Sequence, residues 1–247
     1  MYLPNGVFAG IEFFQHSPAL VAVDTQIVAD APVRYLVAGM GDALSTWYEA
    51  RTVMENPEAT NNLGTRPTMA ATFLGELCAR TLYAHGEAAV TAVQQHSVTD
   101  ALECVVEANT LLSGVGFESG GLAVSHAVAQ GLTVIPECHQ QYLHGEMVAI
   151  GLLTQLVLEN RREDAWEVGE FFTRVGLPVH LGQLGLSAQD TARLRPVMET
   201  AIMLPIVHNE PFPVTEASLV EASQQAHALG KEVTRRMGDV AYRALHD

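Results

Sequence analysis

The chain has 247 residues, of which 48% are hydrophobic and 17% charged, a composition typical of one large globular domain or of a domain with a small appendage. Its 28 acidic and 13 basic residues give a formal net charge of −15, which repels nucleic acids and anionic membrane surfaces and argues against both as partners. Its three cysteines are odd in number and widely spaced, which argues against a disulfide framework or a cysteine-based zinc site and favours a reducing, cytoplasmic setting.

The first 30 residues differ in pattern from the rest. Residues 1–10 contain no basic region followed by an apolar stretch, so we expect no secretion signal. Short apolar runs at Ile11–Phe14 and Leu20–Val23 are separated by a turn sequence that contains Pro18. This pattern predicts two strands and a turn, so we expect residues 1–30 to form a short β-hairpin.

From residue 31 onward the pattern becomes helical, because apolar side chains recur at intervals of three and four residues. We therefore expect a mainly α-helical, multi-helix domain over residues 31–247. Thr99 or Ser97 is suited to cap one helix and Thr215 another, whereas Gly131 is suited to end one. The expected helices span about 31–54, 67–84, 86–94, 98–115, 119–130, 144–159, 163–175, 187–203 and 215–245, and a proline-rich connector spans 205–214.

The segment 144–159 is apolar on nearly every face, which predicts a central helix that runs through the interior. Its most apolar stretch, Met147–Leu158, is interrupted by Thr154 and Gln155. It is also well short of the roughly 20 residues that a helix needs to span a bilayer, so we expect no membrane segment.

Three residues are candidates for a functional site. His126 and His144 each lie near the start of an apolar helix, with glycines nearby that allow close approach of the backbone. A histidine on an apolar segment is more often a hydrogen-bonded core or surface residue than a metal ligand. Asp42, in the run Gly39–Leu44, is equally suited to stabilise the positive end of a helix. The residues alone leave both interpretations open, and no local motif for nucleotide binding is present.

A resemblance favours the functional interpretation. The chain resembles the glycerol dehydrogenases, which belong to the iron-containing, or group III, alcohol dehydrogenase family. The matching motifs are Val23–Thr25, Gly39–Arg51, Gly114–Ala123, His126–Val128, His144–Glu146 and Gln155–Asn160. They occur in the order found in the family and run along essentially the whole chain.

The resemblance implies that Asp42, His126 and His144 hold a divalent metal, Zn²⁺ in the first instance, with Fe²⁺ or another divalent cation as the alternative. Two imidazoles and a carboxylate suit such a metal and leave coordination positions open for substrate. The implied reaction is oxidation of glycerol, or a related vicinal diol, to dihydroxyacetone, with hydride transfer from a metal-bound alkoxide to NAD. Phe117 would line the substrate pocket, although an apolar residue there is otherwise simply core.

The sequence also departs from the family. The Rossmann-like nucleotide-binding domain that normally precedes this region has no counterpart here, so residues 1–30 would be a hairpin remnant of it and residues 31–247 the metal- and substrate-binding domain. Ala129 stands where the family often has a further histidine, and Met147 where it has a lysine. Both changes remove polar groups and leave the substrate-side hydrogen bonding open.

Two hypotheses follow. In the first, the chain is an enzyme acting on a small polyol, with NAD held by a domain or subunit outside it. In the second, it is a metal-binding, oligomer-forming domain without dehydrogenase activity, because no nucleotide-binding domain binds NAD. A homo-oligomer is expected in either case, since apolar cleft walls left uncovered tend to find partners.

Overall fold

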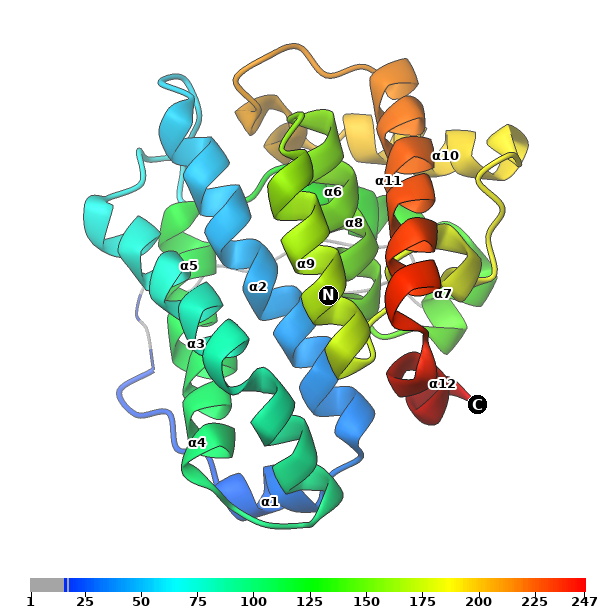
Figure 1. The fold of residues 1–247 in the computed structure, drawn as a ribbon. Helices are drawn as coiled ribbons and strands as arrows, with labels where there is room; N and C mark the ends of the chain where they lie inside the picture. The colour runs from blue at the N-terminus through cyan, green and yellow to red at the C-terminus, as the bar shows by residue number, and fades with distance from the viewer. Residues whose placement is uncertain (1–15, 17) are drawn as a thin grey trace.

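The computed structural model describes residue 16 and residues 18–247, and these residues form a body of packed helices without strands (Figure 1). The prediction of a mainly α-helical bundle is confirmed. The elements are α1 (Thr25–Asp30), α2 (Val33–Glu55), α3 (Met69–Gln94), α4 (Asp100–Glu107), the π-helical turn η1 (Ala108–Leu112), α5 (Ser113–Gly120), α6 (Val124–Leu132), α7 (Pro136–Gln141), α8 (His144–Leu158), α9 (Arg162–Val175), the 3-10 helix η2 (Leu181–Leu184), α10 (Thr191–Ile202), the 3-10 helix η3 (Pro205–Asn209), α11 (Glu216–Met237) and α12 (Val240–His246).

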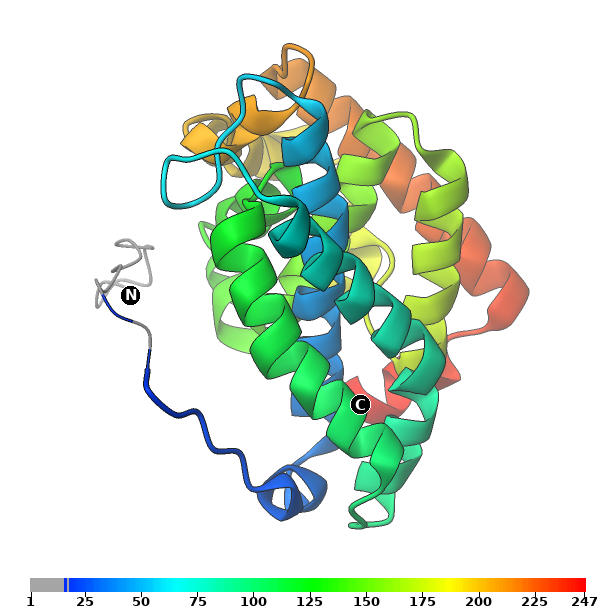
Figure 2. The ribbon, with the colours of Figure 1, turned by 90° about the vertical axis from the view of Figure 1, so that its left-hand side faces the viewer.

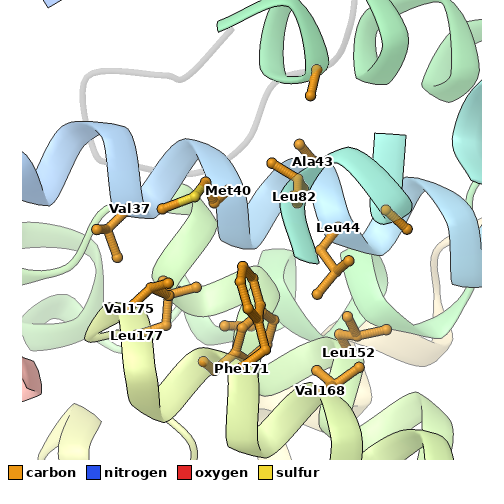
Figure 3. Close-up of a cluster of buried hydrophobic side chains, with 14 of the residues drawn as sticks. Val37, Met40, Ala43, Leu44, Leu82, Leu152, Val168, Phe171, Val175 and Leu177 are labelled. Atoms are coloured by element: carbon orange, nitrogen blue, oxygen red, sulfur yellow. The ribbon is translucent and has the colours of Figure 1, made fainter. Parts of the chain in front are cut away.

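Helix α8 runs through the interior, as its sequence predicts. Every residue from Gly145 to Val157 is buried, and α2, α6, α9 and α11 pack around the helix. On one side the core is built from α2, α3 and α9, where Phe171 points toward Met40 and Leu44 (Figure 3). A second apolar cluster joins α6, α8 and α10. None of the helices in the described part of the chain is both long and apolar enough to cross a membrane.

Two helix boundaries differ from the prediction because glycines serve packing. The expected break between 67–84 and 86–94 is absent, since α3 continues through Gly86. A Cβ atom on Gly86 would lie 2.9 Å from the ring of Phe171, so the glycine makes room for that ring. Gly131 likewise lies inside α6, where a Cβ atom would lie 2.3 Å from the carbonyl oxygen of Val197 on α10. The helix ends one residue later, at Leu132, so the predicted end is close, but Gly131 serves packing and has no left-handed conformation.

The segment before α6 is also longer and differently divided than predicted. Thr99 caps α4 by accepting a hydrogen bond from the amide of Leu102, as expected. The helix then continues through η1 and α5 to Gly120. The predicted end of this helix at 115 and the predicted start of the next one at 119 are therefore both wrong. The break occurs at Gly121, whose φ of 95° is a conformation that favours glycine.

The second half of the chain contains two helices that periodicity did not reveal, α7 and α12. Helix α7 has only six residues, which is too short for a periodic pattern, and begins at Pro136. The predicted helix 215–245 is capped by Thr215 but ends at Met237, because Gly238 adopts a φ of 83° and separates α12. The connector at 205–214 contains the 3-10 turn η3.

The first strand of the predicted hairpin, Ile11–Phe14, lies outside the described residues. Its second expected strand, Leu20–Val23, is neither helix nor strand, and the side chain of Leu20 is 80% exposed. Residues 18–24 run beside the helical body as an irregular arm (Figure 2). Residues 25–30, which we assigned to the hairpin, form α1 because Asp24 caps its first turn, and α1 packs on α3 and α4.

The crossing of α6 and α8 supplies a test of this packing. A Cβ atom on Gly151 would lie 2.1 Å from the carbonyl oxygen of Ser125. We therefore expect Gly151→Ala to lower the free energy of unfolding by about 1–3 kcal/mol or more, as overpacked cores do. Urea denaturation measures this change.

Gly114 on α5 is the matched control, since a Cβ atom there would meet nothing within 4 Å. Gly114→Ala should raise stability by about 0.5–1 kcal/mol, because alanine is the better helix former. Equal unfolding midpoints for the two variants would contradict the described crossing.

Candidate metal centre

The three side chains singled out in the sequence lie together. Asp42 comes from the middle of α2, His126 from the first turn of α6 and His144 from the first position of α8. Each offers one ligand atom, and the three atoms lie within 4.8 Å of one another. The Oδ1 atom of Asp42 lies 3.2 Å from Nε2 of His126 and 3.8 Å from Nε2 of His144.

Glycines bring the helices that carry these side chains close together. A Cβ atom on Gly145 would lie 1.8 Å from the carbonyl oxygen of Ala38, and one on Gly41 would lie 2.6 Å from the carbonyl oxygen of Gly145. Helix α2 and the first turn of α8 therefore touch through their backbones. This contact places His144 beside Asp42.

Glu49 is a site residue that the sequence analysis missed. Its side chain is fully buried, and its Oε2 atom lies 2.6 Å from Nδ1 of His126. Its Oε1 atom accepts hydrogen bonds from the backbone amides of Ala123, at 2.8 Å, and of His126, at 3.1 Å. One carboxylate thus satisfies free amides at the start of α6 and turns Nε2 of His126 toward Asp42.

A signal for Glu49 is present in the sequence. Glu49 follows Asp42 by seven residues on α2, which places the two carboxylates about two turns apart on the same helix face. A buried carboxylate that orients a histidine through its second nitrogen is a common support of metal-ligating imidazoles. The spacing alone, however, does not indicate which histidine either carboxylate contacts.

The charges of the site depend on one another. Burial alone would lower the pKa of His126, but the carboxylates of Glu49 and Asp42 outweigh it and raise that pKa to about 10. Burial would likewise raise the pKa of Asp42, yet the hydrogen bond and charge of His126, with a contribution from His144, lower it. Burial lowers the pKa of His144, whose Nδ1 atom is buried without a hydrogen-bond partner. Asp42 is therefore an anion and His144 a neutral nitrogen donor at neutral pH.

This arrangement fits a divalent cation. Two imidazole nitrogens and one carboxylate oxygen converge, and one imidazole is oriented by a second, buried carboxylate. That donor set suits zinc or a related borderline metal and leaves positions open for a further ligand. The residues that could hold the cation are Asp42, His126 and His144.

The three side chains face a cavity of about 470 Å³. Phe117 from α5 forms part of its wall, and its ring centroid lies 5.9 Å from that of His126. Ala129 and Met147, the two departures noted in the sequence, are buried in the apolar core and do not line this cavity. The other lining residues are Thr46, Asn109, Ser113, Gly114, Leu122 and Gln130.

An ion pair between Arg34 and the buried carboxylate of Glu146 holds the first turn of α8, which carries His144. The carboxylate of Glu146 accepts two hydrogen bonds from Arg34, at 2.6 and 2.7 Å, and one from the amide of Leu143, at 2.8 Å. Nε2 of His246, near the end of the chain, lies 2.9 Å from the same carboxylate. Burial would raise the pKa of Glu146, but these hydrogen bonds and the charge of Arg34 lower it to about 2.

Comparison with known proteins identifies relatives of this chain. No family model matches the chain. The glycerol dehydrogenase of Thermotoga maritima is 47% identical over 235 residues, which are 94% of this chain and 64% of that protein. The structure of a probable glycerol dehydrogenase from Sinorhizobium meliloti superposes with a TM-score of 0.88 at 39% identity, over 94% of this chain and 65% of that one. An iron-containing alcohol dehydrogenase from Thermococcus thioreducens shares the fold, with a TM-score of 0.59 at 15% identity over 83% of this chain and 53% of that one.

The helical body thus has the fold of the iron-containing alcohol dehydrogenases. Within that class, the chain is homologous to the C-terminal part of the glycerol dehydrogenases, as the sequence motifs predicted. It spans 64% of the length of the Thermotoga maritima relative.

The cluster formed by Glu146, Arg34 and His246, which we call the Glu146 cluster, predicts a specific dependence of stability on pH. The pKa of Glu146 is lowered on folding, so its contribution is fully present above its ordinary value of 4.5 and is lost as the pH falls toward about 2. We expect Glu146→Gln to remove a contribution on the order of 2 kcal/mol near neutral pH and progressively less in acid.

Urea unfolding of both proteins at a series of pH values measures the difference. Glu118→Gln, at an exposed position of α5, is the control and should follow the wild type throughout. A gap between Glu146→Gln and wild type that stays constant down to about pH 3 would contradict the described ion pair.

Proposed function

We propose that this chain is the metal- and substrate-binding part of a glycerol-dehydrogenase-type enzyme. The substrate would be glycerol or a related vicinal diol, oxidised to dihydroxyacetone or the corresponding hydroxyketone with NAD as hydride acceptor. The observation that carries the proposal is the convergence of Asp42, His126 and His144 on one wall of a cavity. The identity to glycerol dehydrogenases, 47% for that of Thermotoga maritima, supports the substrate class.

The chain's own residues divide the work in this proposal. A divalent cation, Zn²⁺ first and Fe²⁺ as the alternative, supplies Lewis-acid polarisation of a substrate hydroxyl when it is bound. Asp42, His126 and His144 would hold that cation. Glu49 would accept a hydrogen bond from Nδ1–H of His126, which keeps the proton on Nδ1 and leaves Nε2 to bind the cation. Phe117 would exclude water from one side of the substrate.

Hydride transfer requires the nicotinamide to lie within van der Waals reach of the substrate carbon. We propose that the NAD site is formed by residues outside the helical body, in another domain or subunit. A second candidate function is that of a metal-binding, oligomer-forming domain without dehydrogenase activity. The observation that favours it is that the described helical body alone supplies all three candidate metal ligands, Asp42, His126 and His144. Oligomer formation stays a prediction in both cases.

The proposal predicts that the purified chain binds about one zinc ion and that binding raises its melting temperature, because the ion binds only the folded state. Asp42→Ala, His126→Ala and His144→Ala should each weaken zinc binding, with melting temperatures that no longer respond to chelator. Zinc affinity of the wild type should rise between about pH 5 and about pH 8, since a cation must displace protons from the imidazoles. Metal analysis and melts with and without chelator measure these effects.

An NADH assay on the same zinc-loaded sample separates the two candidates. NADH formation with glycerol and NAD that disappears in His126→Ala supports the enzyme. One zinc per chain without NADH above a blank supports the metal-binding domain. Zinc affinity that is flat across the same pH range would refute histidine ligation, and with it both candidates.

Glu49 supplies a separate prediction about orientation. Glu49→Gln keeps an oxygen for the amides at the start of α6 but removes the charge that pairs with His126. We expect zinc affinity to fall by about 10- to 100-fold, as loss of such supporting carboxylates does elsewhere. Glu55→Gln, at an exposed position of the same helix, is the control. Unchanged zinc affinity in Glu49→Gln, measured by competition with a chelating dye, would show that Glu49 serves the fold alone.

A further inference from the structure

Two amide side chains of the cavity wall have oxygen atoms without partners. Oε1 of Gln130 on α6 and Oδ1 of Asn109 in η1 are buried and accept no hydrogen bond. Other buried amides are well satisfied: Asn209, for example, donates to the carbonyls of Thr60 and Leu122 and accepts from the amide of Thr60. Since a buried acceptor without a partner is unfavourable, native proteins retain few of them, and those retained call for an explanation.

The positions of the two amides point to a ligand. Gln130 lies four residues, or about one helical turn, after His126 on α6, and Asn109 belongs to the π-helical turn η1. Such turns occur frequently at functional sites. Both side chains line the same cavity as the three candidate metal ligands. A molecule held at that centre would therefore share the cavity with both amides.

Gln130 also lines a second cavity, of about 510 Å³, which shares Leu122 with the first. The residue therefore lies between two spaces. Asn109 is more constrained, because a Cβ atom on Gly39 would lie 2.7 Å from its Nδ2 atom. Gly39 thus makes the space in which the Asn109 amide fits against α2.

We infer that Gln130 and Asn109 bind the hydroxyl groups of a polyol that the cation does not hold, and so select polyols over monohydric alcohols. The inference rests on the proposed function, which supplies the cation and the substrate class. An amide oxygen accepts a hydrogen bond from a hydroxyl and an amide N–H donates one, so the pair suits neighbouring hydroxyls. A monohydric alcohol leaves these groups unpaired, which is the strongest basis for its rejection.

The test uses the zinc-loaded chain and measures binding of glycerol and of 1-propanol by ligand-observed NMR titration. Gln130→Met has nearly the same shape without polar atoms, and Asn109→Ala removes the second amide. We expect each variant to weaken glycerol binding about threefold to tenfold, the effect of one neutral hydrogen bond, while 1-propanol binding and zinc affinity stay at the wild-type level. Gln225→Met, at an exposed position on α11, is the matched control.

Thermal unfolding distinguishes binding from a structural role. Because the Gln130 oxygen has no partner in the fold, Gln130→Met should melt at or above the wild-type temperature. A lowered melting temperature, unchanged glycerol affinity, a parallel loss of 1-propanol affinity, or undetectable glycerol binding by the zinc-loaded wild type would each overturn the inference. Failure of the wild-type chain to bind zinc would instead refute the proposed function.

Discussion

The pairing of Glu49 with the start of α6 is the interaction on which the site depends. A fully buried carboxylate is costly unless charged partners and hydrogen bonds surround it. Glu49 meets that requirement with the imidazole of His126 and the amides of Ala123 and His126. The same contacts fix where α6 begins and which nitrogen of His126 faces Asp42. One side chain therefore both stabilises the fold and orients a ligand of the candidate metal centre.

Close backbone contact completes the arrangement. Helix α8 is buried nearly throughout, so its first residue is held by the core rather than by a loop. Gly41 and Gly145 allow α2 to approach that first turn, and the Glu146 cluster fixes its direction. Three helices thus contribute one candidate ligand each, and the packing of these helices fixes the positions of the ligands. Sites built on such elements keep their geometry better than sites built on loops.

The sequence predicted the parts of the fold that are governed by local pattern. The helices at 31–54, 144–159 and 163–175 lie close to α2, α8 and α9, because apolar periodicity and interior composition are properties of a short segment. Several of the errors arose at glycines. Gly86 and Gly131 stand inside helices because partners far along the chain, Phe171 and Val197, need the space, and no local pattern contains that information.

The site shows the same limit. Asp42, His126 and His144 are dispersed along the chain, so their spacing could not distinguish ligands from core residues, and it was the family motifs that grouped them. Glu49 escaped notice because its partners lie 74 and 77 residues away. Its burial follows only from how α2 meets α6, which is a property of tertiary packing.

The link between the end of the chain and α8 has a practical consequence. The ring of His246, the penultimate residue, stacks on Tyr242 with centroids 3.9 Å apart and bonds to Glu146 two residues after His144. An affinity tag fused after Asp247 would therefore lie next to His246, which contacts the first turn of α8 through Glu146. A polyhistidine tag would in addition bring imidazoles that compete for metal to that region. Protein intended for metal titration is better purified without any addition at this end.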